Sequence, residues 1–257
     1  MPTLNENRRI WQQDYDWSNR GDEWSEAWGG EDAQWYGAVL PRVHSFVTNP
    51  DGSAKAQTIL EIAPGFGRWT KYLIPLCQRL IVVDLASKCI EACRQRFKAC
   101  SHIEYHQNDG KSLAVVPDAA IDFVFSMDSL VHADEEVMDA YMRQLASKLT
   151  PQGVAFLHHS NFGEFSALFG KIPDHNRSRT TARQIKGVAE AAGLRCLSQE
   201  FVNWGGTELI DALSVFARAD SDWKMPYRSL KNGDFMNEAG YWARLAQIYG
   251  RRSVGTR

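Results

Sequence analysis

The chain has 257 residues, five of them cysteines, and a formal net charge of −2. A chain of this length buries a substantial core, and a charge so near neutrality provides no basic field for a phosphate backbone, so we expect no nucleic-acid partner. No apolar run approaches the ~20 residues of a membrane span, and the first residues lack the apolar core of a secretory signal. The cysteines form no CxxC pair. We therefore expect reduced thiols, a cytoplasmic protein and no membrane association.

Residues 1–55 are predicted to form a tryptophan-rich N-terminal cap. They contain Trp11, Trp17, Trp24, Trp28 and Trp35, and rings of this size require burial against another surface. Within this cap, residues 33–47 predict a helix that is kinked near Pro41, and residues 49–53 predict a turn. Two interpretations of the tryptophans remain open, a structural lid on the sheet or a wall for a ligand.

From residue 58 the chain alternates between strand and helix patterns. Strands are predicted at 58–63, 80–86, 102–107, 121–127 and 153–160, and helices at 68–78, 88–98 (with Ser87 as its cap) and 134–148. Continuous apolar strands separated by helices indicate a parallel sheet that is covered on both faces.

The last third of the chain changes pattern. Thr181 to Gln184 predicts a capping box that opens a helix over 182–192. Strand-like segments at 194–204 and 208–219, separated by two glycines, predict an antiparallel pair. A final helix is expected at 236–249, docked through a side that carries Tyr241, Trp242, Leu245 and Ile248.

These patterns together predict an α/β protein with a Rossmann-like, doubly wound, seven-stranded sheet. The sheet is mostly parallel and ends in a C-terminal antiparallel hairpin. Residues 56–220 form the main domain, and residues 221–257 form an extension that contains the last helix.

The segment ILEIAPGFGRWT places a glycine turn directly after the first strand of this sheet. Asp84 ends the next strand, where a carboxylate can accept both hydroxyls of a ribose, and Asp109 follows the third strand at the same edge. The third glycine of a dinucleotide-binding turn is replaced by Thr70. Glu61 adds a negative charge, which disfavours a pyrophosphate. The turn therefore favours a cationic nucleoside without phosphate, such as S-adenosylmethionine, over a nicotinamide dinucleotide.

These motifs, over residues 56–219, resemble class I S-adenosylmethionine-dependent methyltransferases. The resemblance rests on the ExxxGxG pattern from Glu61 to Gly67, on Asp84, on Asn108-Asp109 and on the segment Ser126 to Asp128. It implies that the glycine turn holds the methionine portion of the cofactor, Asp84 binds the ribose, and Asn108-Asp109 faces the adenine. The cofactor residues that it implies are Glu61, Ala63, Gly65, Gly67, Arg68, Asp84, Leu85, Asn108, Asp109, Gly110 and Met127.

The predicted catalytic candidates follow strands four and five: Asp128, His132, His158 and His159. A hydroxyl acceptor needs a base that removes its proton, and histidine is the commonest choice. Because side chains alternate along a strand, only one of the paired histidines is expected to face the cofactor. Which one does so stays open, as does a core position for either of them. His132 alternatively only closes the cofactor pocket. A Mg²⁺ ion held by Asp128 and His159 is also left open.

The methyl acceptor is predicted to be a small molecule. The segment SMDSLVH after strand four lacks the Asn/Asp-Pro-Pro-aromatic motif of base methyltransferases. The segments WGG, EIAPGFGRWT, VVDLA and HHSN resemble bacterial sugar O-methyltransferases of polysaccharide and glycoside biosynthesis, including enzymes that methylate mannosides. This resemblance implies a saccharide or oligosaccharide acceptor, flanked by the N-terminal tryptophans and by a loop at 161–180.

Alternative functions are O-methylation of a phenol or natural product, a non-catalytic S-adenosylmethionine-binding module, and a dinucleotide oxidoreductase. Assembly into a homo-oligomer is left open.

Overall fold

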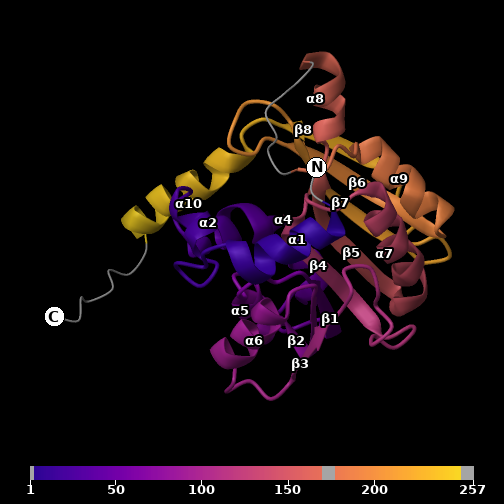
Figure 1. Ribbon diagram of the computed structural model, residues 1–257, viewed down its shortest axis with the longest axis horizontal. Helices are drawn as coiled ribbons and strands as arrows, with labels where there is room; N and C mark the ends of the chain where they lie inside the picture. The colour runs from indigo at the N-terminus through magenta and orange to yellow at the C-terminus, as the bar shows by residue number, and fades with distance from the viewer. Residues whose placement is uncertain (1–2, 170–176, 250–257) are drawn as a thin grey trace.

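A computed structural model describes residues 3–169 and 177–249 of the chain. Within them, one mixed sheet runs in the order β3-β2-β1-β4-β5-β7-β6-β8 (Figure 1). The strands are β1 (Ala56–Ile62), β2 (Cys77–Asp84), β3 (Ile103–Gln107), β4 (Ile121–Leu130), β5 (Leu149–Ser160), β6 (Leu194–Val202), β7 (Asp211–Arg218) and β8 (Arg228–Asn232).

The first five strands are parallel, as their apolar runs predict. β1 pairs with β2 on one side and with β4 on the other, so the strand order reverses next to β1. Ligands of open parallel sheets bind beyond the carboxyl ends of the strands at such a switch point. This arrangement brings the glycine turn after β1 and Asp84 at the end of β2 to one edge.

The far end of the sheet is antiparallel, which confirms the predicted hairpin. β7 lies antiparallel to both β5 and β6. The prediction of seven strands was wrong, because β8 adds an eighth strand parallel to β6. Its sequence, RSLKN, is almost entirely exposed. An edge strand of this kind pairs through its backbone and needs no apolar pattern, so the sequence gives no signal for it.

Helices cover both faces of the sheet, as expected for a doubly wound fold. One face packs against α7 (Glu135–Lys148) and α9 (Ala182–Ala191). The other face packs against α4 (Leu40–Val47), α5 (Thr70–Leu73) and α6 (Ser87–Arg96). The N-terminal part also contains α1 (Leu4–Arg9), a π-helical turn at Ile10–Asp14, α2 (Glu23–Glu26) and α3 (Glu31–Gln34).

Several predicted helix boundaries differ in the structure. The helix expected at 68–78 stops at Leu73 and continues only as a 3₁₀ turn over Ile74–Leu76, which contains Pro75. Ser87 is the first residue of α6 and does not cap it, since its hydroxyl donates to Gln12 Oε1 at 3.1 Å. In the segment predicted as a helix over 33–47, a π-helical turn, Trp35–Val39, precedes Pro41. The capping box of Thr181 with Gln184 is confirmed.

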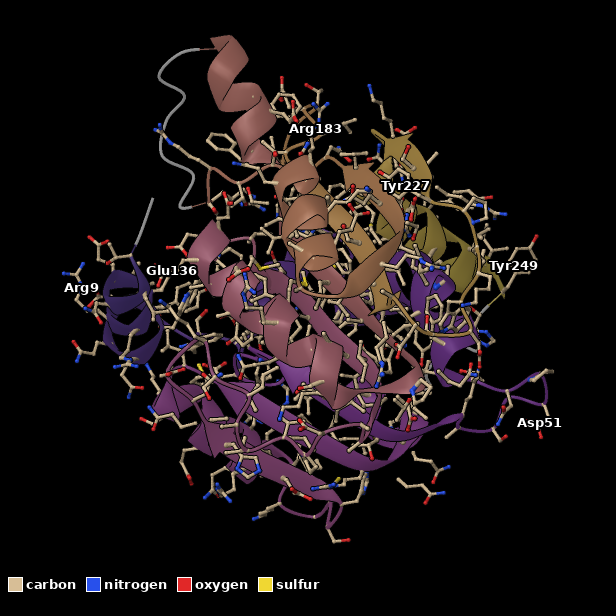
Figure 2. All side chains as sticks on the ribbon, turned by 90° about the vertical axis from the view of Figure 1, so that its right-hand side faces the viewer. Arg9, Asp51, Glu136, Arg183, Tyr227 and Tyr249 are labelled. Carbon is tan, nitrogen blue, oxygen red and sulfur yellow. The ribbon has the colours of Figure 1, made fainter. Side chains whose placement is uncertain are left out.

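The last helix, α10 (Phe235–Tyr249), is confirmed, but only part of its predicted docking face is buried: Trp242 is half-buried and stacks on Tyr36 with ring centroids 5.3 Å apart. Tyr241 is 59% exposed and Ile248 is 71% exposed, and Tyr249 projects at the edge of the molecule (Figure 2). The helix attaches through Phe235, Met236 and Ala239 in its first half. A helix that was not predicted, α8 (Phe162–Phe169), lies inside the segment 161–180 that was expected to be a loop. Residues 170–176 of that segment lie outside the described part.

Candidate active site

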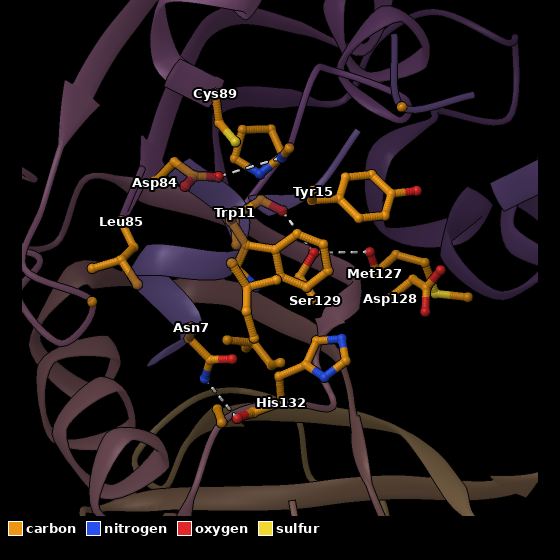
Figure 3. A pocket seen from close by; sticks show the side chains of 18 of the residues that line it. Asn7, Trp11, Tyr15, Asp84, Leu85, Cys89, Met127, Asp128, Ser129 and His132 are labelled. Carbon is orange, nitrogen blue, oxygen red and sulfur yellow. Dashed lines mark hydrogen bonds between the residues drawn. The ribbon is translucent and has the colours of Figure 1, made fainter. Parts of the chain in front are cut away.

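A cavity of about 350 Å³ lies at the carboxyl ends of β1, β2 and β4, and the N-terminal segment closes it. Figure 3 shows Trp11 inside this cavity, with Asp84 and Cys89 on one side and His132 on the other. The volume is at the lower end of the range of about 300–1,000 Å³ that is typical of small-molecule sites.

The glycine turn has the backbone conformation that its sequence requires. Ala63, Gly65 and Gly67 have φ values of 57°, 59° and 86°, in the left-handed region that glycine adopts without cost. A Cβ atom on Gly67 would lie 2.5 Å from Cε2 of Phe97, so only glycine allows the chain after α6 to pack this closely. Ala63 adopts the same region without being glycine, which the sequence did not indicate.

Asp84 is buried at the wall of the cavity. Its carboxylate accepts hydrogen bonds from the backbone N–H groups of Ala86 at 2.7 Å and Gly65 at 3.3 Å. Burial nevertheless raises the pKa of Asp84 to about 7, since desolvation penalises the charged form. A partly protonated carboxyl group at this edge can be ionised by a ligand that donates hydrogen bonds to it, and the two hydroxyls of a ribose are such donors.

Glu61 lies behind the turn and does not line the cavity. Its Oε2 accepts a hydrogen bond from the Thr70 hydroxyl at 2.6 Å, and burial raises the pKa of Glu61 to about 8. Thr70 is therefore the partner of Glu61 in this structure. The expected repulsion of phosphates by a charged Glu61 has no support in this buried position, because the carboxyl group is mostly protonated near neutral pH.

The other predicted cofactor residues divide into two groups. Ala63, Gly65, Arg68, Leu85, Gly110 and Met127 line the cavity with Asp84. Gly67, Asn108 and Asp109 lie behind it with Glu61 and shape the loops. Asn108 Oδ1 accepts from the N–H of Gly110 at 2.9 Å, and Asp109 accepts from the N–H of Ser112 at 2.7 Å. These two side chains hold Gly110 at the cavity wall.

Asp128 and His132 line the far end of the cavity, beyond Met127. Asp128 pairs with Arg68 at 3.1 Å, and Arg68 also donates to Gln34 at 2.9 Å. The ring of His132 lies 5.4 Å from that of Trp11 between centroids. This end therefore combines a carboxylate, an imidazole, a guanidinium and aromatic faces.

His158 and His159 are fully buried and do not line the cavity. Nδ1 of His159 lies 3.0 Å from the carbonyl oxygen of Ser160, and its Nε2 lies 2.7 Å from Oγ of Ser214. Burial lowers the pKa of His159 to about 4. The structure thus gives both nitrogens of His159 internal partners and separates it from the acceptor end. The partner Ser214 belongs to β7, which flanks β5 on the side opposite to β4.

The N-terminal tryptophans have two different environments. Trp35 is buried in the core, whereas Trp11, Trp17 and Trp24 line the cavity. Trp17 stacks on Phe66 of the glycine turn, with centroids 4.3 Å apart and planes inclined by 7°. The N-terminal segment is therefore both a lid on the sheet and a wall of the cavity.

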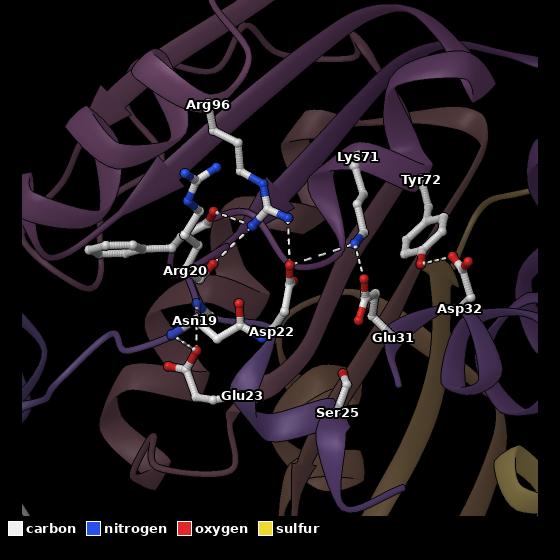
Figure 4. A network of polar contacts seen from close by, with 12 residues as sticks. Asn19, Arg20, Asp22, Glu23, Ser25, Glu31, Asp32, Lys71, Tyr72 and Arg96 are labelled. Atoms are coloured by element: carbon white, nitrogen blue, oxygen red, sulfur yellow. Dashed lines mark hydrogen bonds and ion pairs between the residues drawn. The ribbon is translucent and has the colours of Figure 1, made fainter. Parts of the chain in front are cut away.

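An ionic network ties this lid to the sheet (Figure 4). Asp22 pairs with Arg96 at 2.7 Å and lies 3.8 Å from Lys71, which also binds Glu31 at 3.0 Å. Arg96 in addition donates to the backbone carbonyls of Arg20 and Phe66. These contacts fix residues 20–31 across the glycine turn.

Among the residues that line the cavity but were not predicted from the sequence are Tyr15, Arg177 and Trp204. Burial, with the negative charges of Glu23 and Asp128 nearby, raises the pKa of Tyr15. Arg177 binds Asp211 through two hydrogen bonds, at 2.8 and 2.7 Å. None of these residues belongs to a local motif, and only the fold brings them to the site.

Within residues 3–169 and 177–249, no three histidine, cysteine, aspartate or glutamate side chains are grouped so that they could hold a metal ion. The two predicted metal candidates, Asp128 and His159, have the separate partners described above. In the same part of the chain no helix has the length and apolarity that crossing a bilayer would need.

The segment that carries much of this site is similar to known proteins. The family described as "Methyltransferase domain" matches residues 59–153. A 97-residue segment is 33% identical to nodulation protein S of Bradyrhizobium diazoefficiens; it covers 37% of this chain and 46% of the relative. The match thus spans less than half the length of that curated relative.

Solved structures share the fold. The N-methyltransferase NodS from Bradyrhizobium japonicum WM9, in complex with S-adenosyl-L-homocysteine, superposes with a TM-score of 0.55 at 18% identity, over 84% of this chain and 97% of that one. The DhpI complex with S-adenosylhomocysteine gives 0.55 at 16% identity, over 84% and 94%. The PH0226 protein from Pyrococcus horikoshii OT3 gives 0.53 at 17% identity, over 73% and 93%.

Residues 59–153 match a methyltransferase domain, and this match together with the fold supports the class I, S-adenosylmethionine-dependent type. S-adenosylmethionine is the cofactor of this domain. The position of Asp84, Gly65 and Gly110 around the cavity fits such a cofactor, since they offer a carboxylate and exposed backbone at the switch point.

Proposed function

We propose that this protein transfers the methyl group of S-adenosylmethionine to a hydroxyl oxygen of a small polyhydroxylated acceptor, a saccharide. The observation that carries the proposal is the composition of the cavity beyond Met127. There Asp128, His132 and Arg68 lie among the rings of Trp11 and Trp24. Aromatic faces stack on sugar rings, and the polar groups can bind their hydroxyls.

His132 and Asp128 are the proposed catalytic pair. Methyl transfer is an in-line displacement from an activated sulfonium, so the protein mainly aligns the acceptor with the methyl group. We assign to Asp128 the orientation of the acceptor hydroxyl and to His132 the removal of its proton. His158 and His159 receive no base role, because neither of them lines the cavity, whereas His132 does.

The cofactor end and the division of the chain are part of the same proposal. We assign the ribose hydroxyls to Asp84, the methionine portion to Gly65 and Arg68, and the adenine to the wall formed by Leu85 and Gly110. Residues 1–55 would act as the cap, 56–220 as the methyltransferase domain and 221–257 as the extension.

A second candidate is N-methylation of an amine. It is favoured by the description of the NodS structure as an N-methyltransferase, and by one feature of this chain. The carboxylate of Asp128 beside aromatic faces also suits a cationic ammonium group. The pocket would bind either acceptor through the same wall, and the two acceptors would differ only in the atom that receives the methyl group.

A methyl-transfer assay on an acceptor panel separates these candidates. Purified protein is incubated with S-adenosylmethionine and with neutral saccharides, amino-saccharides or phenols, and S-adenosylhomocysteine release and product mass are measured. We expect turnover with a neutral saccharide and its loss in His132→Ala, which should keep affinity for S-adenosylhomocysteine by calorimetry. Turnover with the amino-saccharide alone would select the N-methylation candidate, and turnover with phenols alone would refute the saccharide proposal. Cofactor binding without turnover on any acceptor would favour a non-catalytic module.

A further inference from the structure

His158 connects the floor of the cavity to a buried carboxylate. Its Nδ1 accepts a hydrogen bond from the backbone N–H of Asp128 at 3.0 Å, and its Nε2 lies 3.2 Å from Oδ2 of Asp211. The ring of Trp204 covers it, with centroids 5.0 Å apart. His158 and Asp211 are both fully buried, so the imidazole reaches no ligand directly.

These contacts define the tautomer of His158. A backbone N–H can only donate, so Nδ1 carries no proton in this contact and the proton of the neutral ring lies on Nε2. Nε2 lies 3.2 Å from Oδ2 of Asp211, within ion-pair distance, so this carboxylate is the charged neighbour of the imidazole. Asp211 also holds Arg177, which lines the cavity. One buried carboxylate therefore positions groups at two points of the cavity wall.

The residue held by His158 has an uncommon backbone. Asp128 has a φ of 61°, a left-handed conformation that costs a residue with a Cβ atom about 1–2 kcal/mol. Such a conformation persists only where the surroundings hold it, and it is often found at functional sites. Here the hydrogen bond to His158 holds the N–H, and the Arg68 pair holds the carboxylate at the cavity.

We propose that His158 is a positioning residue: oriented by Asp211, it fixes the left-handed backbone of Asp128 and thereby places the Asp128 carboxylate against the methyl acceptor. This proposal deepens the proposed function and rests on it for the role of Asp128. His158, which was predicted to be catalytic, would then act on Asp128 and would not contact the substrate.

Two substitutions separate the two contacts of His158. In His158→Asn, the amide oxygen can replace Nδ1 and still accept from the Asp128 N–H, while the contact with Asp211 is lost. In His158→Gln, the amide nitrogen can replace Nε2 beside Asp211, while the contact with Asp128 is lost. Ser214→Ala is the matched control, because Ser214 is a fully buried polar residue of β7 that bonds to His159 and Gln199 and does not line the cavity.

We expect His158→Gln to lower kcat by about 10–100-fold, the range expected from misplacing a positioned group. His158→Asn and Ser214→Ala should stay within about threefold of the parent, and all three variants should keep the parent's affinity for S-adenosylhomocysteine by calorimetry. Equal losses of kcat in the Asn and Gln variants, or none in either, would overturn the proposal.

A second readout does not depend on turnover. Amide hydrogen exchange of the Asp128 N–H should become faster in His158→Gln and stay slow in His158→Asn. If the parent methylates no acceptor but this exchange pattern appears, the proposed function fails while the hydrogen bond is real. If the Asp128 amide stays protected in His158→Gln, the positioning role is refuted whatever the activity.

Discussion

Replacing Asp84 by Asn should stabilise the cofactor-free protein and weaken cofactor binding, and the gain in stability should grow with pH. Burial raises the pKa of Asp84 from its ordinary value of 3.8 to about 7. A carboxyl group with a raised pKa in the folded state lowers stability as pH rises from the unfolded pKa to the folded one. Asparagine removes this ionisation and keeps an oxygen that can accept from the N–H of Ala86.

The magnitude follows from the shift. Each pKa unit corresponds to 1.36 kcal/mol, so the raised pKa of Asp84 costs the folded state about 2 kcal/mol at pH 5.5 and about 4 kcal/mol at pH 8. The advantage of Asp84→Asn over the parent should therefore increase by about 2 kcal/mol between these two pH values. In a domain of this size that difference corresponds to about 4–8 °C in Tm.

Urea denaturation of the cofactor-free parent and variant at pH 5.5 and pH 8 tests this expectation. Asp109→Asn is the matched control. Backbone hydrogen bonds from Lys111 and Ser112 lower the pKa of Asp109, so its contribution is fully present at both pH values, and this variant should lose the same stability at pH 5.5 as at pH 8. An advantage of Asp84→Asn that is the same at both pH values would refute the reasoning. A loss of stability in Asp84→Asn at pH 8 would do so too.

Three further outcomes are expected. The Kd for S-adenosylhomocysteine should rise by up to about tenfold per pH unit below pH 7, because the ribose hydroxyls bind ionised Asp84; calorimetry from pH 5.5 to 8 measures this, and a flat profile would contradict the ribose assignment. Trp17→Ala removes the stack on Phe66 and should weaken that affinity by about 2–10-fold, given the value of about 0.5–1.5 kcal/mol for an aromatic pair; it should also speed tryptic cleavage at Arg20, and unchanged affinity and cleavage would argue against a lid. Arg42→Met leaves Glu200 and Glu238, which Arg42 binds at 2.5 and 2.7 Å, without their cation and should cost about 3–5 kcal/mol in urea denaturation; a cost under about 1 kcal/mol would show that the pairs are not coupled to folding.

Local sequence determined the central part of the fold. The apolar runs that became β1, β2 and β4 have no polar face, so they require cover on both sides, and the parallel sheet follows. The glycine turn and the place of Asp84 could be predicted for the same reason, because both depend on local sequence: glycines permit a left-handed turn, and Asp84 is the last residue of its strand. The capping box at Thr181 is equally local.

Tertiary structure decided what the side chains at the site do. The pair His158-His159 at the end of β5 predicted a catalytic role, yet both residues are buried where β5 pairs with β7, and His158 lies 3.2 Å from Asp211, more than fifty positions later. Arg177 and Trp204 reach the cavity from segments without a motif, and β8 joins the sheet through its backbone alone. Periodicity reports how a segment is folded locally, whereas the partner of a side chain depends on which distant segment packs against it. The sequence therefore predicted the edge of the sheet that carries the cavity, whereas only the tertiary structure showed that His158 and His159 lie outside its wall.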